Sequence, residues 1–138
     1  MHFRKTTEYA IRVMTFLAEN AGERFPVSNL NKRLNIPYKY LGRLMNQLAQ
    51  KDLVQVAQGK YGGYMIEPSR LADIFLYQIV DAVEGLGDYD RCILGFPECS
   101  DEHPCALHHL WVKQREAIKK MLYTTSLADL VNRDIQKL

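Results

Sequence analysis

One helical repeat that leads directly into a glycine-rich alternating stretch constrains the fold of this chain more than any other feature. Residues 37–52, PYKYLGRLMNQLAQKD, begin with a proline that suits a first helical turn. Their apolar side chains fall at the spacing i, i+3, i+4 and i+7 of one buried helix face: Leu41, Leu44, Met45 and Leu48. Residues 53–68, LVQVAQGKYGGYMIEP, alternate apolar and polar side chains around GKYGG, which predicts a two-stranded hairpin.

Two shorter helical segments come before this pair. Residues 6–20, TTEYAIRVMTFLAEN, carry Thr6 or Thr7 as a candidate N-cap. Their apolar stripe consists of Tyr9, Ala10, Val13, Met14, Phe16 and Leu17. Residues 29–35, NLNKRLN, have Ser28 as a candidate cap and turn Leu30 and Leu34 inward. Three helices followed by a hairpin predict a winged helix-turn-helix over residues 1–70.

Helices are also expected over most of residues 71–138. A helix is predicted from about Phe75 to Gly85, a long one from about Pro104 to about Tyr123, and a short last one over 124–135, capped by Thr125 or Ser126. The long helix carries apolar residues near a seven-residue spacing: Leu107, Trp111, Ile118 and Met121. This seam either packs on its own domain or on a second copy, and we expect a homodimer. The predicted fold is mainly α with a small β-hairpin.

Charge is divided unevenly along the chain. Residues 1–70 contain 11 Lys and Arg against 5 Asp and Glu, whereas residues 71–138 contain 7 against 11. A basic half is typical of a protein that faces a polyanion, although a solvated positive face gives the same count. In a helix-turn-helix, the second helix enters the major groove of double-stranded DNA. The candidate DNA contacts are Tyr38, Lys39 and Arg43 on that helix and Lys60 and Tyr61 at the hairpin tip.

Composition excludes several other classes of protein. Hydrophobic residues make up 47% and charged residues 25% of the chain, as in ordinary globular proteins. No apolar run approaches the roughly 18 residues of a membrane span and the N-terminus lacks a secretory signal, so no membrane partner and a cytoplasmic location are expected. No Ser-His-Asp pattern, paired catalytic carboxylates or phosphate-cradling loop stands out, and the chain is not expected to be an enzyme.

All three cysteines lie in one stretch that lacks a helical period, RCILGFPECSDEHPCALHHLW (91–111). Their spacing is C-x6-C-x5-C, and we expect a loop over about residues 88–106. Structural disulfides are rare in a reducing compartment, so metal binding or redox sensing is favoured. Zinc usually has a C-x2-4-C pair, and the wider gaps suit an iron-sulfur cluster, either [2Fe–2S] or [4Fe–4S].

Three thiolates leave a cluster one protein ligand short. The candidates for the fourth are His103, His108, His109 or an acid from another element. Free surface thiols, a zinc site and a disulfide switch between Cys99 and Cys105 remain alternatives. A small electron-transfer protein is a further alternative, against which the basic helix face argues.

The chain resembles a family of small bacterial regulators that includes the iron-sulfur cluster regulator IscR, the nitric oxide-sensitive repressor NsrR and the cysteine-metabolism repressor CymR. The likeness rests on the three cysteines and on TTEYAIRVM, IPYKYLGRLMNQLAQKDLV, GKYGGY, IVDAVEG and TTSLADLV. It implies a homodimeric winged helix-turn-helix transcriptional regulator with the long C-terminal helix at the dimer interface. It also implies sensing of redox state, nitric oxide or iron-sulfur status.

The resemblance also implies a ligand set. Cys92, Cys99 and Cys105 match the cysteines that hold the cluster in the cysteine-bearing members. In the IscR branch a histidine three residues after the last cysteine is the fourth ligand, and His108 has that offset. In the NsrR branch it is an aspartate of the first helix from the other subunit, and Glu8 has that position. The sequence departs from IscR by one extra residue between the first two cysteines and from NsrR by Glu in place of Asp.

Overall fold

A computed structural model describes residues 2–131 of the 138-residue chain. Its helices and strands are α1 (Lys5–Glu19), α2 (Val27–Leu34), α3 (Tyr38–Gln50), β1 (Gln55–Ala57), β2 (Gly63–Met65), α4 (Leu76–Val83), α5 (His108–Thr124) and α6 (Leu127–Val131), with 3₁₀ turns η1 (Pro68–Arg70) and η2 (Gly87–Asp90). The predicted class, mainly α with one hairpin, is confirmed. The part of the last predicted helix beyond Val131 lies outside the described residues.

Apolar side chains from both halves of the chain form one hydrophobic core. The largest fully buried side chains are Met14, Leu17, Leu30, Ile36, Leu41, Leu44, Met45, Leu48, Ile66, Ile74, Ile79 and Leu122. The predicted inward face of α3 and Leu30 of α2 are among them, and Leu34 of α2 is also buried. Because α4 and α6 both pack on α1, the core continues across residue 70. The division of the chain into residues 1–70 and 71–138 stays a prediction about function.

The hairpin is tied to the helices at Gly63. β1 and β2 pair antiparallel with Val56 opposite Tyr64, and Tyr64 also bridges to Phe25 in front of α2. Gly63 has φ +145°, and a Cβ atom there would lie 2.6 Å from the carbonyl carbon of Phe25. Only glycine fits this close approach of two backbones. It fixes the hairpin beside the start of α2.

Three predicted helix starts are wrong. α1 begins at Lys5 with Arg4 as N-cap, so Thr7 lies inside the helix, where it is fully buried. Pro26 is the N-cap of α2, and Ser28 lies within that helix. α5 begins at His108 instead of near Pro104, because the intervening residues form the loop around the cysteines.

One predicted cap is confirmed at α6. The hydroxyl of Ser126 accepts a hydrogen bond from the backbone N–H of Asp129, and the Asp129 carboxylate accepts one from the N–H of Ser126. This reciprocal pair is a capping arrangement that satisfies two backbone donors of the first turn.

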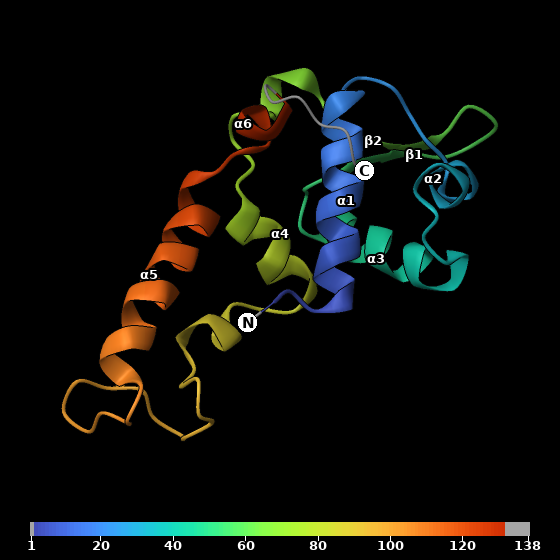
Figure 1. The fold of residues 1–138 in the computed structure, drawn as a ribbon. Helices are drawn as coiled ribbons and strands as arrows, with labels where there is room; N and C mark the ends of the chain where they lie inside the picture. The colour runs from blue at the N-terminus through green and yellow to red at the C-terminus, as the bar shows by residue number, and fades with distance from the viewer. Residues whose placement is uncertain (1, 132–138) are drawn as a thin grey trace.

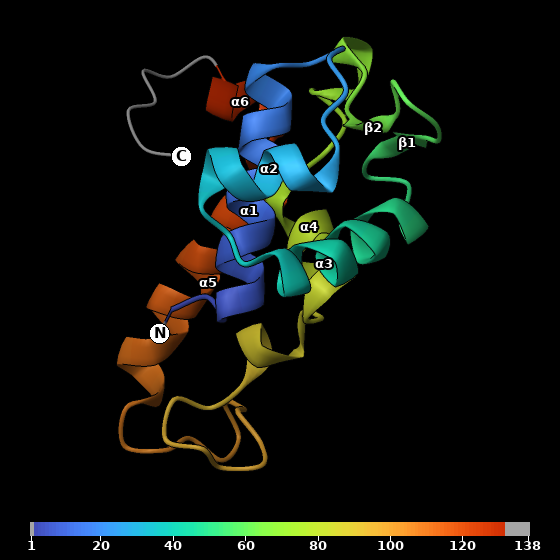
Figure 2. The ribbon, with the colours of Figure 1, turned by 90° about the vertical axis from the view of Figure 1, so that its right-hand side faces the viewer.

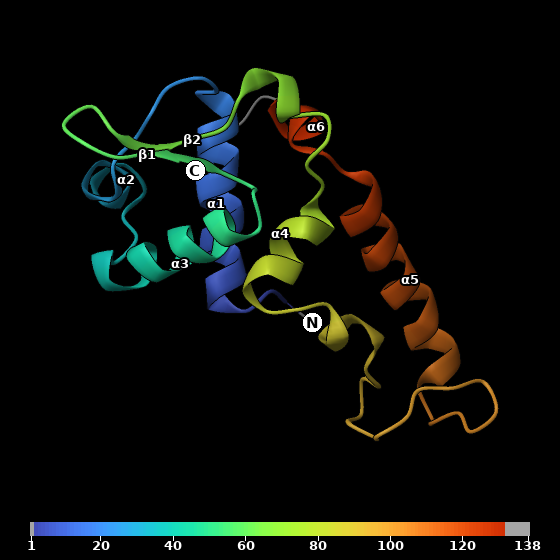
Figure 3. The same ribbon diagram turned by 180° about the vertical axis from the view of Figure 1, so that it is seen from behind.

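α5 stands apart from the helix-turn-helix (Figure 1). α1 and α4 lie between α5 and the group formed by α2, α3 and the hairpin, and the view from behind in Figure 3 agrees. The cysteine loop, residues 91–107, extends beyond the N-terminal end of α5, and the hairpin lies at the opposite side of the molecule. The cysteine loop and the surface predicted to contact DNA are thus well separated in one chain.

Candidate cysteine site and nucleic-acid interface

The residues of α3 that are predicted to contact DNA are exposed to solvent. Asn35 ends α2 in the left-handed conformation, with φ 53°, which makes the sharp turn into α3 (Figure 2). Tyr38, Lys39 and Arg43 are exposed on α3. They lie in the first two turns of the helix, the part that reaches base edges in this motif.

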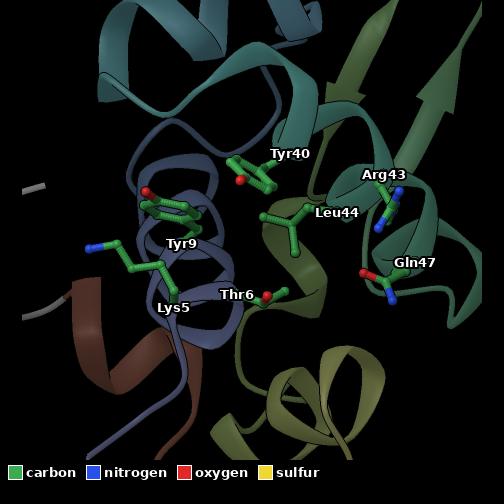
Figure 4. Close-up of a pocket in the computed structure, with 7 residues that line it drawn as sticks. All are labelled: Lys5, Thr6, Tyr9, Tyr40, Arg43, Leu44 and Gln47. Atoms are coloured by element: carbon green, nitrogen blue, oxygen red, sulfur yellow. The ribbon is translucent and has the colours of Figure 1, made fainter.

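The candidate DNA contacts divide between two surfaces. A groove of about 330 Å³ between the start of α2 and the hairpin is lined by Tyr38, Lys60 and Ser28. Tyr61 is 81% exposed at the tip of the same hairpin. Arg43 instead lines a cleft of about 440 Å³ between α1 and α3 (Figure 4). The sequence predicted Ser28 as a helix cap and did not predict that it lines this groove.

The cleft around Arg43 joins α1 to the helix that would read DNA. Lys5, Thr6 and Tyr9 come from α1, and Tyr40, Leu44 and Gln47 join Arg43 from α3 (Figure 4). The Lys39 ammonium lies 5.3 Å from the ring centre of Tyr40, a cation–π distance. Because both helices line this cleft, a shift of the first turn of α1 would change the surroundings of Arg43 on α3.

The cysteine loop brings its four predicted ligands together in two pairs. The sulfur atoms of Cys92 and Cys105 are 3.6 Å apart. The sulfur of Cys99 is also 3.6 Å from Nδ1 of His108. Two ligands of one tetrahedral metal, with bonds of about 2.3 Å to sulfur and about 2.1 Å to nitrogen, lie roughly 3.5–3.8 Å apart. Each pair has the separation of two ligands on one metal ion.

No single point of convergence joins the two pairs. Across residues 2–131, no group of three or more His, Cys, Asp or Glu side chains stands close enough together to hold one metal ion. A structural zinc site needs four such ligands around one ion. Among the described residues, the predicted ligands therefore stand as two separate pairs.

Backbone N–H groups surround the buried sulfur of Cys92. Burial by itself raises the pKa of this thiol, but hydrogen bonds from the backbone of Phe96, Leu94 and Gly95 and from the Cys105 thiol outweigh it and lower the pKa. Gly95 has φ +84°, which lets the turn fold back over the sulfur. Such a cluster of N–H groups stabilises a thiolate, the form of cysteine that binds metals.

His108 stands between a sulfur and a carboxylate. Its side chain is 3% exposed, with Nδ1 toward Cys99 and Nε2 2.8 Å from an oxygen of Asp101. The hydrogen bond and charge of His108 lower the pKa of Asp101. A carboxylate on the far nitrogen fixes the orientation and tautomer of a ligating imidazole. Sequence reasoning missed Asp101.

Arg115 was also missed. Its guanidinium Nη1 lies 3.1 Å from the sulfur of Cys99. The signal was present in the sequence, because Arg115 follows His108 by seven residues and therefore lies two turns along the same face of α5.

Glu8 lies in the first turns of α1, half-buried, with a carboxylate oxygen 3.5 Å from the Lys5 ammonium. The resemblance assigned Glu8 a role toward the cysteines of the other subunit. A single chain does not test that role, which stays a prediction.

The two ends of the cysteine loop are anchored to different elements. On the side of Cys92, η2 is bound to α1, since Arg4 Nη2 lies 2.6 Å from Asp88 and Arg4 Nε lies 3.5 Å from the buried Glu84 carboxylate. Tyr89 of η2 is buried and donates a hydrogen bond to Glu84. Burial and this hydrogen bond raise the pKa of Tyr89.

The same end of the loop, at η2 and Arg91, also contacts α5 directly. Lys119 pairs with Asp90 at 2.7 Å, and the indole Nε1 of Trp111 donates to the carbonyl oxygen of Arg91 at 3.1 Å. At the other end of the loop, Cys105 lies just before α5, and the N–H of His108 at the start of α5 donates to the carbonyl of Cys105. The Cys92–Cys105 contact therefore adds a further link between the η2 side and the start of α5.

Comparison with known proteins decides the family. The sequence pattern of the Rrf2 family, described as an iron-dependent transcriptional regulator, matches residues 3–133. The chain belongs to the Rrf2 family of transcriptional regulators. This agrees with the resemblance found in the sequence and with the expectation that the chain is not an enzyme.

Individual Rrf2 relatives are similar along almost the whole chain. An HTH-type transcriptional regulator of Aquifex aeolicus is 30% identical over 96% of this chain and 92% of its own length. The HTH-type transcriptional regulator IscR of Xenorhabdus nematophila is 30% identical over 95% of this chain and 79% of its own.

Solved structures of similar proteins have the same fold. CymR, the global cysteine regulator of B. subtilis, superposes with a TM-score of 0.77 at 28% identity and covers 97% of this chain and 99% of its own. IscR of T. potens superposes with a TM-score of 0.72 at 24% identity and covers 96% and 87%, respectively. The winged helix predicted from the sequence is confirmed by this agreement. None of the helices in residues 2–131 is long and apolar enough to cross a membrane.

Proposed function

We propose that this Rrf2 protein binds operator DNA as a homodimer and senses its signal through a [2Fe–2S] cluster held by the cysteine loop. The observation that carries the proposal is the arrangement of Cys92 with Cys105 and of Cys99 with His108, each pair 3.6 Å apart. A [2Fe–2S] cluster takes two protein ligands on each iron. Cys92 and Cys105 would hold one iron, and Cys99 and His108 the other.

The chain's own groups fit this cofactor. The backbone N–H groups that face Cys92 favour its thiolate, and Asp101 holds the imidazole of His108 with Nδ1 toward Cys99. When bound, the cluster would supply one-electron chemistry and reactivity toward oxidants or nitric oxide. The iron held by Cys99 and His108 would have one thiolate ligand, whereas the iron held by Cys92 and Cys105 would have two. Ligand exchange, or attack by an oxidant or nitric oxide, would be favoured at the iron with one thiolate. His108 is preferred over Glu8 as the fourth ligand because it lies beside a cysteine in the same chain.

DNA binding is supported by the exposed basic residues of α3 and by the hairpin. Lys39 and Arg43 are free to reach base edges or phosphates, and Lys60 and Tyr61 would contact the backbone beside the groove. Phosphate contacts of this kind make affinity fall with salt. As a transcriptional regulator, the protein would act in the cytoplasm.

The surface of α5 supports the homodimer. Of its 17 residues, only His108 and Leu122 are buried in the chain. Leu110 is 69% exposed, Met121 43% and Tyr123 45%. Ile118 of the predicted seam packs partly on its own core, and Leu110, which the seam omitted, is the most exposed apolar residue of the helix. A second α5 would cover this apolar surface.

The loop anchors suggest how the signal reaches DNA. A cluster bound by both pairs would hold the η2 side of the loop, which is tied to α1 through Arg4, against the start of α5. Loss of the cluster would remove this link and leave the contacts of Asp90 and Arg91 with α5. Because α1 lines the cleft that contains Arg43, release would change how the two α3 helices of a dimer are held.

The decisive experiment is anaerobic purification followed by visible absorption and by counting of iron and acid-labile sulfide. We expect about two irons and two sulfides per chain, a colour that oxygen or nitric oxide bleaches, and affinity for DNA that changes with bleaching. Cys92→Ala and His108→Ala should lose the cluster, whereas His109→Ala, at the neighbouring exposed position, should retain it. A colourless protein with one zinc per chain would contradict the proposal. Loss of the cluster in Glu8→Ala but not in His108→Ala would transfer the fourth ligand to α1.

A thiol switch is the second candidate, and the 3.6 Å approach of Cys92 to Cys105 favours it. An oxidant such as a peroxide would take two electrons and two protons from these thiols and leave one disulfide, about 2.05 Å between sulfurs. The pair differs from the Cys99–Cys105 disulfide that was one of the alternatives left open by the sequence, since Cys99 lies beside His108. Peptide mass mapping of iron-free protein after peroxide treatment would detect a Cys92–Cys105 link in about every chain if this switch operates.

A further inference from the structure

The two ligand pairs have different surroundings. Neutral backbone N–H groups face the sulfur of Cys92. Full charges face the other pair, since the Arg115 guanidinium contacts Cys99 and the Asp101 carboxylate contacts His108. A cation and an anion therefore act on the two ligands of one proposed iron.

Arg115 is well placed to hold a fixed position against the sulfur. Its side chain is only 15% exposed, and its Nη2 lies 3.2 Å from the carboxylate of Glu116, which steadies the guanidinium. It projects from the middle of α5, a regular element, toward a sulfur 3.1 Å from Nη1. A hydrogen bond from a charged donor is about twice as strong as one from a neutral donor.

We propose that Arg115 raises, and Asp101 lowers, the reduction potential of the iron bound by Cys99 and His108, so that this pair of residues sets the potential at which the regulator responds. The inference rests on the proposed function, because it requires the cluster. Arg115 and Asp101 are positioning residues, since they act through the ligands and touch no iron themselves.

The sign of each effect follows from charge. Uptake of one electron from a one-electron donor such as dithionite adds one negative charge to the cluster, without a bond being broken. The Arg115 cation on the thiolate of Cys99 stabilises that added charge, which favours reduction. Asp101 accepts a hydrogen bond from the Nε2–H of His108 and makes the imidazole a stronger electron donor, which favours the oxidised iron.

The test is a spectroelectrochemical titration of the anaerobically purified full-length protein at one fixed pH. Arg115→Gln removes the cation and keeps a long polar side chain. We expect its reduction equilibrium constant to fall about tenfold, which is a shift of about 59 mV to more negative potential for a one-electron couple. Asp101→Asn should shift the potential in the opposite direction. Opposite signs distinguish a specific effect from general damage to the loop.

Lys113→Gln is the matched control. Lys113 is an exposed cation of α5 two residues before Arg115 and therefore on a different face of the helix, so its loss should leave the potential near that of the parent protein. Arg115→Lys keeps the charge and should recover part of the shift, and it serves as the readout if Arg115→Gln does not retain its cluster. The electron paramagnetic resonance signal of the reduced protein should also change in the Arg115 and Asp101 variants and not in Lys113→Gln.

The outcomes separate the two levels of inference. A parent protein without iron and sulfide would refute the proposed function itself. A parent protein that carries the cluster, but whose potential is the same in Arg115→Gln and Asp101→Asn or moves in one direction in both, would overturn only the roles assigned to these residues.

Discussion

The helix-turn-helix and the cysteine loop are held together by different forces. Core residues of α1 to α3, such as Met14, Leu17 and Leu41, are fully buried by apolar contacts. In residues 91–107, only Cys92 is buried, while Leu94 is 49% and Phe96 58% exposed. The loop depends on its sulfur contacts, its turns and a few polar anchors. A region held in this way would change conformation with what binds its thiols, as proposed above, whereas a packed core would not.

The sharpest way to test this contrast is to truncate one apolar side chain in each region. Leu17→Ala leaves a cavity beneath α1 and should lower the free energy of unfolding by about 2–5 kcal/mol. Leu94→Ala in the loop should change it by less than about 0.5 kcal/mol, because that side chain is half exposed. Urea unfolding of the iron-free proteins measures both. A comparable loss in the two variants would show that the loop shares the packing of the core.

The direct contacts to DNA should come from the packed half alone. Lys39→Ala combined with Arg43→Ala removes two exposed cations of α3 and should weaken binding by roughly 1–3 kcal/mol, about 5-fold to 150-fold. The probe is a duplex selected from a random pool by the parent protein, with affinity measured at two salt concentrations. Iron content should not change.

Lys51→Ala is the control for this surface, because it removes an exposed cation from the far end of α3. Equal weakening by Lys51→Ala would mean that total charge, and not the N-terminal face of α3, accounts for the affinity.

A smaller effect is expected at α6, which links the second half of the chain to the core. Ser126→Ala removes the hydroxyl that caps this helix and should cost about 1 kcal/mol of stability. Ser69→Ala, at an exposed position in η1, should cost much less. Thermal unfolding compares the two, and equal melting temperatures in both variants would argue against a stabilising cap.

The weakest expected effect lies where the two regions meet, at Arg4 and Asp88. Burial alone raises the pKa of Asp88, but hydrogen bonds and charges from Arg91 and Arg4 outweigh it and lower the pKa. The stabilisation is therefore complete above the unfolded pKa of about 3.9 and disappears as the pH falls through the lower folded value. Arg4→Gln should be less stable than the parent at neutral pH, and the difference should shrink in acid. Urea titrations of iron-free protein between about pH 3 and 7 measure it, and a difference independent of pH would exclude Asp88 as the cause.

The same contrast explains what the sequence predicted well. Apolar spacing alone identified the buried faces of α2 and α3 and the hairpin, because a packed core repeats along each element. The order of three helices and a hairpin then indicated the fold. Ser126 was found because its cap partner is three residues away.

The side-chain contacts that the sequence did not predict join residues that are distant in the sequence. The start of α5 was predicted near Pro104 but lies at His108. The residues in between belong to the loop around the cysteines and form no turn of α5. The contact of Arg115 with Cys99 spans 16 residues, and that of Arg4 with Asp88 spans 84. Local spacing carries little information on such pairs, although the seven-residue step from His108 to Arg115 was readable.

The position of Trp111 gives the loop a built-in reporter. It is the chain's single tryptophan, and its indole N–H donates a hydrogen bond to the carbonyl of Arg91. Trp111 also lines a shallow cleft together with Cys92. Movement of the loop root would change the polarity around the indole, so its emission wavelength should follow the state of the thiols. The parent protein therefore allows the conformational change to be timed by stopped-flow fluorescence without any added label.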